Sequence, residues 1–446
     1  MVSLYCIILT LLYIFGASLG KRDICSPRFL FNTYAWLKNV PYFWQIGNTY
    51  GNALCFKYFI IKVIGWMMVN IGISFYQKYF SRKWEYYTNE SSNPAKDSSL
   101  VKYSIAAWGL FIVGFIMKAY IVVRIGGVNY VLSHLQGRGT MLANFGYLNT
   151  FSTYFVNSAV LSAEYFMCKT GRKGSRISFL IITALSALTL IVFGARKPVL
   201  MMFVRIFICY HYLKNYYRLR DLFRPKTIAA ILLLVLFMLM MPMLRYYENS
   251  NIYLTPDAWV DQSLDSVNNI FREFSYLTGD MYTFEHFDHS NYWGGKVYLN
   301  IFTQWIPRSL FPNKPPMDDG MYLYNMMRGV SVTPNMPTVS LTYQTSVPFT
   351  LEGSLYVNFG WLGVILGCLF VGMLYQYVYK VMNECDYNIM TIFIYQTIIF
   401  EFTPSVLHTT SPLIAILFMT IITVPLLHIK IKKKLRNSRG NTYVNT

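Results

Sequence analysis

Charge is scarce in this sequence. Only 13% of its 446 residues are Asp, Glu, Lys or Arg, and 54% are hydrophobic. A soluble domain carries about 25% charged residues. The remaining charge is uneven, because apolar runs of nearly twenty residues alternate with short basic clusters. A bilayer partitions a sequence in this way, so the pattern excludes an ordinary soluble domain and predicts an integral membrane protein.

Signatures of metal or nucleotide chemistry are missing as well. No Walker A, GxSxG, HExxH or GxGxxG motif stands in a credible context. The seven cysteines show no CxxC spacing, which argues against a structural zinc or a disulfide framework. His286 and His289 have a spacing that suits a metal, but no third ligand accompanies them, so surface histidines are expected. The sequence therefore predicts no metal and no cofactor.

A net charge of +19 is also found in proteins that bind nucleic acid, so its distribution along the chain matters. The basic residues lie in short loops between alternate apolar runs, as the positive-inside rule requires. The expected partner of these clusters is the anionic surface of the lipid bilayer, and no nucleic acid is expected.

Long apolar runs are abundant, and they predict an all-α fold of about eleven transmembrane helices with one large extracytoplasmic loop. Lys38 and Pro41 interrupt the second run. The first is followed, not preceded, by Lys21 and Arg22, which favours an uncleaved span over a signal peptide. The runs are 3–19, 29–47, 58–77, 103–123, 146–168, 177–194, 198–213, 227–244, 355–379, 388–402 and 413–429.

The basic clusters also predict the orientation. Most of the 39 Lys and Arg residues fall in the cytoplasm if the N-terminus lies outside and the C-terminus inside. The connector 78–102 then reads as a flexible cytoplasmic loop. The expected organisation is N-terminal spans, a large extracytoplasmic loop, three C-terminal spans and a basic cytoplasmic tail: 1–244, 245–351, 352–429 and 430–446.

The large loop contains a proline-rich segment, IPRSLFPNKPP, at 306–316. Its prolines forbid a regular helix, and irregular backbone at a membrane surface is tolerated where it lines a watery cavity. Such a segment would hold Arg308 and Lys314 at the mouth of the bundle, where fixed cations suit a lipid-linked diphosphate. The alternative is a proline-rich turn with snorkelling basic side chains. Both interpretations remain open.

Other ionisable residues stand at the predicted outer face. Arg196, in a tight turn between two spans, and Arg245, at the start of the loop, oppose the positive-inside bias and so need a partner, either lipid headgroups or a bound diphosphate. Glu352 stands at the entry to a span as a general base or, more commonly for such a residue, as a salt-bridge partner of an arginine. Glu401 is a second intramembrane candidate, and Glu164 is expected to be structural.

Four elements resemble the Wzy-type O-antigen and capsule repeat-unit polymerases. The GAR turn at 194–196 resembles the Gly-x-Arg turn of that family, and Arg245 with Tyr246 resembles its basic-aromatic pair. The proline-rich segment is similar to its P-x-x-(W/F)-P-x-(K/R)-P motif. EGSLYVNFG at 352–360 resembles its entry into the next span. The order of spans and loop agrees too.

The resemblance implies a glycosyltransferase-C-like fold and polymerisation of undecaprenyl-diphosphate-linked oligosaccharides at the outer face of the bacterial cytoplasmic membrane. It implies a metal-independent glycosyltransferase in which Arg196, Arg245, Arg308 and Lys314 bind the diphosphate. Glu352 and Arg308 would be catalytic, and a chain-length regulator is a possible partner. The alternatives are an O-antigen ligase that depends on a loop histidine, a lipid-linked oligosaccharide flippase or exporter, and a scaffold in an assembly complex.

Overall fold

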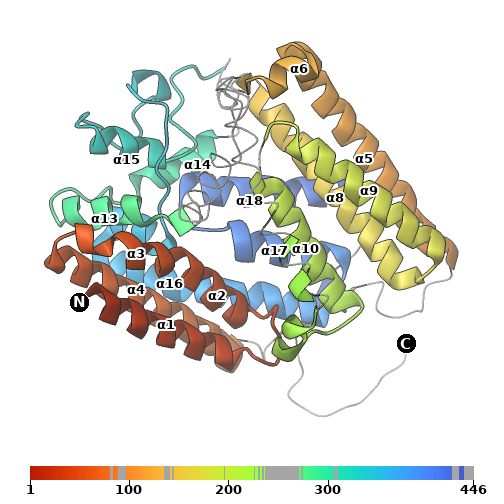
Figure 1. The fold of residues 1–446 in the computed structure, drawn as a ribbon, viewed down its shortest axis with the longest axis horizontal. Coiled ribbons are helices and arrows are strands. Elements are labelled where there is room, and N and C mark those ends of the chain that lie inside the picture. The colour runs from red at the N-terminus through yellow and green to blue at the C-terminus, as the bar shows by residue number, and fades with distance from the viewer. Residues whose placement is uncertain are drawn as a thin grey trace, which may run out of the picture.

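The computed structural model shows an almost entirely helical molecule (Figure 1). Its helices form two groups with further helices between them. The structure describes residues 1–80, 84–88, 97–134, 141–142, 145–194, 196–225, 227–229, 232–233, 236, 271–272, 275–304, 306, 310–423 and 431–435.

The first group is formed by the N-terminal helices and one late helix. It contains α1 (Val2–Leu19), α2 (Pro27–Asn39), α3 (Pro41–Ile46), α4 (Asn52–Phe75) and α16 (Leu351–Glu384), with a 3-10 turn at Gly47–Thr49 and a π-helical turn at Tyr76–Phe80. α4 packs along α16. Their backbones touch because Gly72 and Gly372 carry no side chain: a Cβ on either would lie 2.2 Å from a carbonyl oxygen of the other helix.

The second group consists of α5 (Asp97–Ile125), the short α6 (Gly127–Leu132), α8 (Gly146–Thr170) and α9 (Lys173–Ile191). Between the groups lie α10 (Arg196–Leu213), α17 (Ile389–Glu401) and α18 (Val406–Phe418), which continues as a π-helical segment, Met419–Thr423 (Figure 1). α10 packs on α8 and α17, and α17 packs on α16, so these helices join the two groups.

The large loop forms a layer of short helices at one end of the bundle. These are α13 (Leu277–His286), α14 (Asn300–Thr303) and α15 (Gly320–Met327), with 3-10 turns at Lys296–Leu299 and Thr338–Ser340. α13 packs against both α4 and α16. The layer is therefore attached to two helices of the first group.

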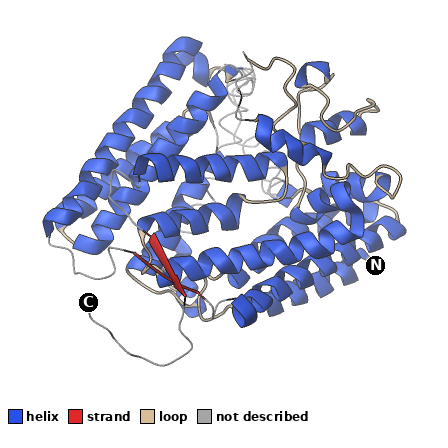
Figure 2. Ribbon diagram, turned by 180° about the vertical axis from the view of Figure 1, so that it is seen from behind, coloured by secondary structure: helices blue, strands red, loops and turns tan. Residues whose placement is uncertain are grey.

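The opposite end carries another 3-10 turn, Leu219–Phe223, and two short strands, β1 (Trp84–Thr88) and β2 (Ile431–Leu435) (Figure 2). The strands pair antiparallel, with Tyr86 opposite Lys433. The connector 78–102, expected to be flexible, thus contributes a strand that pairs with the C-terminal tail. Both segments were predicted for the cytoplasmic face, and both lie at the same end of the molecule.

In the part of the chain that the structure describes, five helices are long and apolar enough to cross a membrane: Val2–Leu19, Asn52–Phe80, Leu100–Ile125, Lys173–Ile191 and Leu351–Glu384. The expected spans 146–168, 198–213 and 388–402, and the described part of 413–429, also coincide with helices, but these are shorter or more polar. Most of the expected span 227–244 lies outside the described residues.

The expected span 29–47 is not one continuous helix. α2 ends at Asn39 and α3 begins at Pro41, because proline has no backbone N–H and its ring clashes with the preceding turn. The two pieces together still traverse the bundle. They contain 13 and 6 residues, a rise of about 28 Å, and Gly47 after them lies against Val2, where α1 begins.

Candidate functional site

Glu352 lies in a buried ion-pair cluster with Lys62 and Asp280. The Lys62 ammonium lies 2.8 Å from Glu352 Oε2 and 2.7 Å from Asp280 Oδ2. It also donates to the Thr350 hydroxyl at 2.6 Å. Lys62 and Asp280 are completely inaccessible, and Glu352 is 3% exposed. The cluster joins α4, α13 and the start of α16.

Two glycines make room for these carboxylates. A Cβ on Gly65 would lie 2.5 Å from Glu352 Cγ, and a Cβ on Gly353 would lie 2.2 Å from Asp280 Oδ1. Glu352 is therefore a salt-bridge partner, although its partner is a lysine of α4 rather than an arginine. An ionised carboxylate held by an ammonium and closed off from solvent is poorly placed to take a proton from a substrate.

Lys314 is also buried, at 4% exposure. Its ammonium donates to the carbonyls of Gln304 and Ile306, both at 2.8 Å, and to the Tyr147 hydroxyl at 3.0 Å. These three acceptors use all three N–H groups of the ammonium. In this arrangement Lys314 fastens the proline-rich segment to α8 and has no donor left for a diphosphate.

The other predicted residues have different outcomes. Arg245 and Arg308 lie outside the described residues, and Arg196 is the first residue of α10. His286 and His289 are exposed. His286 stacks on Tyr282 with 3.9 Å between ring centroids, and His289 contacts Tyr292. The histidines are surface residues, as expected.

A different set of basic residues converges between the two helix groups. Lys38 from α2, Lys197 from α10 and His408 from α18 interact electrostatically with one another; we call this group the basic site. Lys197 is exposed, whereas Lys38 and His408 are half-buried. The Lys38 ammonium lies 4.2 Å from the Tyr34 ring centroid and 4.6 Å from that of Tyr276.

The two lysines of the basic site are not held in direct ion pairs among the described residues. Bringing like charges together costs free energy, and a bound anion recovers it. Lys197 is the second residue of α10, directly after a predicted outer turn, and Tyr276 belongs to the large loop. The basic site thus lies where that loop meets the helices.

Asp318, from the large loop, faces the basic site. It is half-buried and interacts electrostatically with Lys197. Its Oδ1 accepts the Gly320 N–H at 3.0 Å. Burial raises the pKa of Asp318, against the opposing effects of the Ser346 hydroxyl, the Gly320 amide and Lys197. A carboxylate with a raised pKa beside a group of cations suits a general base.

The predicted intramembrane Glu401 forms an ion pair with Arg205 of α10. Arg205 is 11% and Glu401 24% exposed at the side chain. Glu401 also interacts electrostatically with Lys197. This pair therefore extends the charged region from the basic site into the helix bundle.

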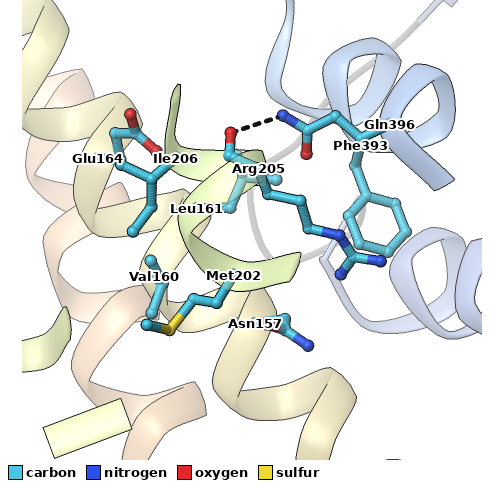
Figure 3. Close-up of a pocket in the computed structure, with 9 residues that line it drawn as sticks. All are labelled: Asn157, Val160, Leu161, Glu164, Met202, Arg205, Ile206, Phe393 and Gln396. Atoms are coloured by element: carbon cyan, nitrogen blue, oxygen red, sulfur yellow. Dashed lines mark hydrogen bonds between the residues drawn. The ribbon is translucent and has the colours of Figure 1, made fainter. Parts of the chain in front are cut away.

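Arg205 also borders a small cavity of about 10 Å³, whose polar lining residues are Arg205, Asn157, Glu164 and Gln396 (Figure 3). The Gln396 amide donates to the Arg205 carbonyl at 2.8 Å. Asn157 Oδ1, Arg205 Nε and Gln396 Oε1 are buried without a protein hydrogen-bond partner. A cavity of this size has room for one water molecule, which polar atoms of this kind would bind.

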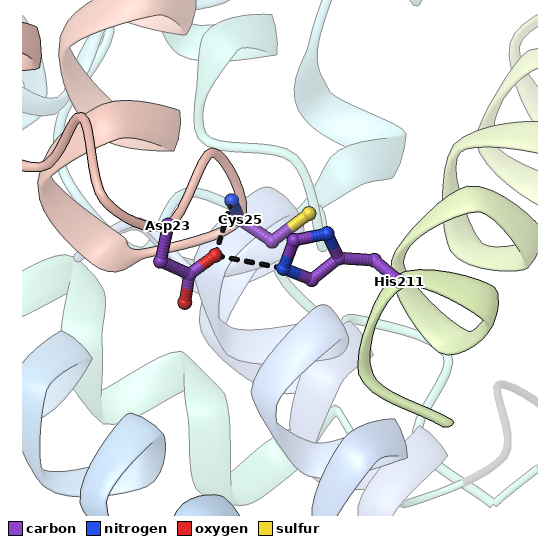
Figure 4. A group of neighbouring side chains, drawn as sticks. All are labelled: Asp23, Cys25 and His211. Atoms are coloured by element: carbon purple, nitrogen blue, oxygen red, sulfur yellow. Dashed lines mark hydrogen bonds and ion pairs between the residues drawn. The ribbon is translucent and has the colours of Figure 1, made fainter. Parts of the chain in front are cut away.

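Asp23, Cys25 and His211 form the group with metal-like geometry among the described residues (Figure 4). His211 Nδ1 accepts the Tyr217 N–H at 3.0 Å, so Nε2 carries the proton and donates to Asp23 Oδ1 at 2.9 Å. The other Asp23 oxygen accepts from Tyr212 and Tyr379. No nitrogen lone pair is left for a metal.

The role of the Asp23 group is structural, because its hydrogen bonds connect separate segments of the chain. Burial alone would raise the pKa of Asp23, but hydrogen bonds from His211 and Tyr379 outweigh burial and hold that pKa below its ordinary value. The ionised carboxylate therefore fastens the turn after α1 to α10 and α16.

The sequence interpretation did not single out Lys62 or Arg205. Each is an ionisable residue inside an apolar run, which is a signal that such a residue faces a partner or a cavity. Lys38 was noted as an interruption of a run, and Lys197 directly follows the predicted Arg196. Lys38 and Lys197 are far apart in the chain, and nothing in the sequence indicates that they lie near each other.

Comparison with protein-family models, with characterised proteins and with solved structures finds no match to this chain.

Proposed function

We propose that this protein polymerises lipid-linked oligosaccharides by glycosyl transfer at the outer face of the bacterial cytoplasmic membrane. The observation that carries the proposal is the basic site, where Lys38, Lys197 and His408 interact electrostatically and neither lysine forms an ion pair with a described side chain. The resemblance of four sequence elements to Wzy-type polymerases supports the same function.

The basic site suits a diphosphate leaving group. In the proposed reaction, an acceptor hydroxyl attacks the anomeric carbon of the lipid-linked donor chain. A carbon–oxygen bond forms to the acceptor while the bond from the anomeric carbon to the diphosphate oxygen breaks. The electron pair leaves with the lipid diphosphate, whose growing negative charge Lys38 and Lys197 stabilise without a metal.

The acceptor hydroxyl must lose a proton in this step. Glu352 is enclosed with Lys62, so we assign the proton acceptor to Asp318, which faces Lys197 and has a raised pKa. Its assignment replaces the earlier hypothesis for Glu352. Arg196, Arg245 and Arg308 stay candidates for binding the donor.

The test is a gel of surface polysaccharide from a deletion strain that carries single variants. We expect the parent ladder to collapse to one capped repeat on deletion and to stay collapsed with Lys197→Ala or Lys38→Ala. Lys197→Arg keeps the charge and should restore part of the ladder. Lys296→Ala, an exposed lysine of the same layer, is the matched control and should restore it fully.

Other outcomes would contradict the proposal. A full ladder with both lysines replaced would remove the basic site from the reaction. Loss of all capped glycan on deletion would indicate a ligase or a flippase. The ligase alternative requires His286 or His289, and replacing either should leave a polymerase ladder unchanged.

Export of lipid-linked oligosaccharide is a second candidate, and one observation favours it. Arg205 lies in the middle of α10 and faces the protein interior with Glu401, as expected for charges that line a membrane pathway. An exporter should accumulate its lipid-linked repeat at the inner face when Arg205 is replaced. A polymerase should accumulate it at the outer face.

A further inference from the structure

An apolar groove of about 790 Å³ runs along α16. Its lining on that helix includes Leu355, Phe359, Leu362, Leu366 and Phe370. The linker between α17 and α18 lines it too. The volume falls within the range of about 300–1,000 Å³ that small-molecule sites occupy.

The sequence of α16 creates this groove. Gly360 breaks the helix with a φ of 61°, which glycine adopts readily. Gly363 and Gly367 then leave no side chain against Leu355, which packs 2.3 Å from the place where a Cβ on Gly367 would stand. The groove is a consequence of three glycines spaced along one apolar helix.

The groove faces hydrocarbon. α16 is among the candidate membrane spans, and Leu362 and Leu366 in the groove are 69% and 62% exposed. From Asn358 to Phe370 the helix rises about 18 Å. A membrane supplies one kind of flexible apolar ligand of that length, a lipid hydrocarbon chain.

One end of the groove is polar. Asn358 is fully buried, lines the groove and has a side-chain oxygen without a hydrogen-bond partner. Tyr292, from the large loop, lines the same end. Chains of lipids lie with their head groups at the membrane surface, so this end is where a head group would enter.

The segment from α17 to the start of α18 connects the groove to the basic site. Phe402, Pro404 and Thr409 line the groove. Glu401 and His408 stand next to them in the chain and belong to the charged region. Ser405 in the same linker shares a hydrogen bond with His408 Nδ1 at 3.0 Å. A lipid whose head group lies at this linker would therefore be near His408, which interacts electrostatically with Lys38 and Lys197.

We propose that this groove binds the polyprenyl chain of the lipid-linked substrate while its diphosphate occupies the basic site. The inference rests on the proposed function. A groove for one chain near two lysines fits a lipid with one chain and a diphosphate better than a phospholipid with two chains and one phosphate.

The test uses the full chain in phosphatidylcholine nanodiscs, with undecaprenyl diphosphate and inorganic diphosphate as probes. Leu366→Trp fills the groove and should weaken binding of undecaprenyl diphosphate by at least about tenfold, since several buried CH₂ groups are displaced. Binding of inorganic diphosphate should not change. Leu188→Trp in α9, at 65% exposure a close match to Leu366, should change neither.

The outcomes separate the two proposals. If Lys197→Ala weakens both probes but Leu366→Trp weakens neither, the groove inference is wrong and the basic site stands. If the unaltered protein binds neither probe, the proposed function fails and the groove inference fails with it. If Leu366→Trp loses binding of both probes, the groove is not specific for the lipid tail, and the inference is also wrong.

A second measurement needs no variant. A photoreactive polyprenyl diphosphate should cross-link to residues 355–370 of the unaltered protein, and undecaprenyl diphosphate should compete. Cross-links elsewhere would overturn the inference. So would cross-links that excess phosphatidylglycerol removes and undecaprenyl diphosphate does not, because the groove would then hold ordinary phospholipid.

Discussion

At the scale of single residues, the most consequential side chain in the helix bundle is Lys62. An ammonium inside a membrane-spanning helix is costly unless it is paired, and Lys62 pairs with two carboxylates and a hydroxyl. One of those carboxylates, Asp280, belongs to α13 in the large loop. Lys62 therefore anchors the loop layer to the bundle.

We expect Lys62→Met to destabilise the protein by about 3–5 kcal/mol, because Asp280 and Glu352 would be left buried without a counter-charge. The measurement is the midpoint of thermal unfolding in nanodiscs. Lys57→Met is the matched control, since Lys57 lies on the same helix, is less buried and donates to the Phe284 carbonyl. Equal, small shifts in both variants would show that the cluster does not stabilise the fold.

Asp319, also in the loop layer, should make stability depend on pH. Burial, and then the neighbouring Asp318, raise the pKa of Asp319 to about 7, whereas an unfolded Asp titrates near 3.9. Between about pH 4 and 7 the folded state keeps a proton that the unfolded state has lost. The contribution of Asp319 to stability should therefore fall as the pH rises through this window.

Asp319→Asn should abolish the fall in stability between about pH 4 and 7. Thermal unfolding from about pH 4 to 8 should show the variant equal to the unaltered protein at the acid end and a few degrees more stable above pH 7. The exposed Asp288 provides a control, because Asp288→Asn should leave the fall in place. An identical pH profile for Asp319→Asn would refute the raised pKa.

At the scale of elements, the apolar runs predict helices well where a helix is simple. α1, α4, α5 and α9 coincide with expected spans because each is a long run without proline. The break between α2 and α3 was visible only as Pro41 and Lys38. Neither the packing of α13 against α4 and α16 nor the proximity of Lys38 to Lys197 could be inferred, since both are long-range contacts that no local pattern encodes.

The candidate site, like the fold, could be predicted from the sequence only in part. The tendency of Glu352 to pair was predictable from its place at the entry to a span, but its partner was not, because Lys62 and Glu352 are far apart in the chain. Lys314 looked like a ligand-binding cation because prolines flank it. The structure instead gives it three acceptors in the protein.

The break in α16 at Gly360 gives a prediction for an element. Gly360→Ala should destabilise the protein by about 1–3 kcal/mol, because a side chain is strained at positive φ. Its Cβ would also lie 2.6 Å from the Tyr292 ring. Gly109→Ala in α5, where a Cβ meets nothing within 4 Å, should be neutral or stabilising. Thermal unfolding of both variants is the measurement, and a neutral Gly360→Ala would argue against the break.

At the scale of the whole molecule, the segments predicted for the cytoplasm gather at one end. The Asp23 tie brings the turn after α1 against the end of α10, where Tyr212 stacks on Tyr387 of the turn after α16 at 5.0 Å. The strands β1 and β2 pair two more such segments. The large loop and the basic site lie toward the other end. The fold thus gives the molecule two distinct faces, and the proposed function requires the face with the basic site to be extracytoplasmic.

Labelling of introduced cysteines tests that orientation. All seven native cysteines are buried, so a membrane-impermeant maleimide should give little background. His289→Cys, in the large loop, should react in intact cells. Lys173→Cys, at the start of α9, should react only after permeabilisation; both positions are exposed. The reverse result would place the basic site in the cytoplasm. A polymerase that takes its donor after the lipid-linked repeat has crossed the membrane could not work there, so the proposed function would have to be abandoned however well the basic site bound diphosphate.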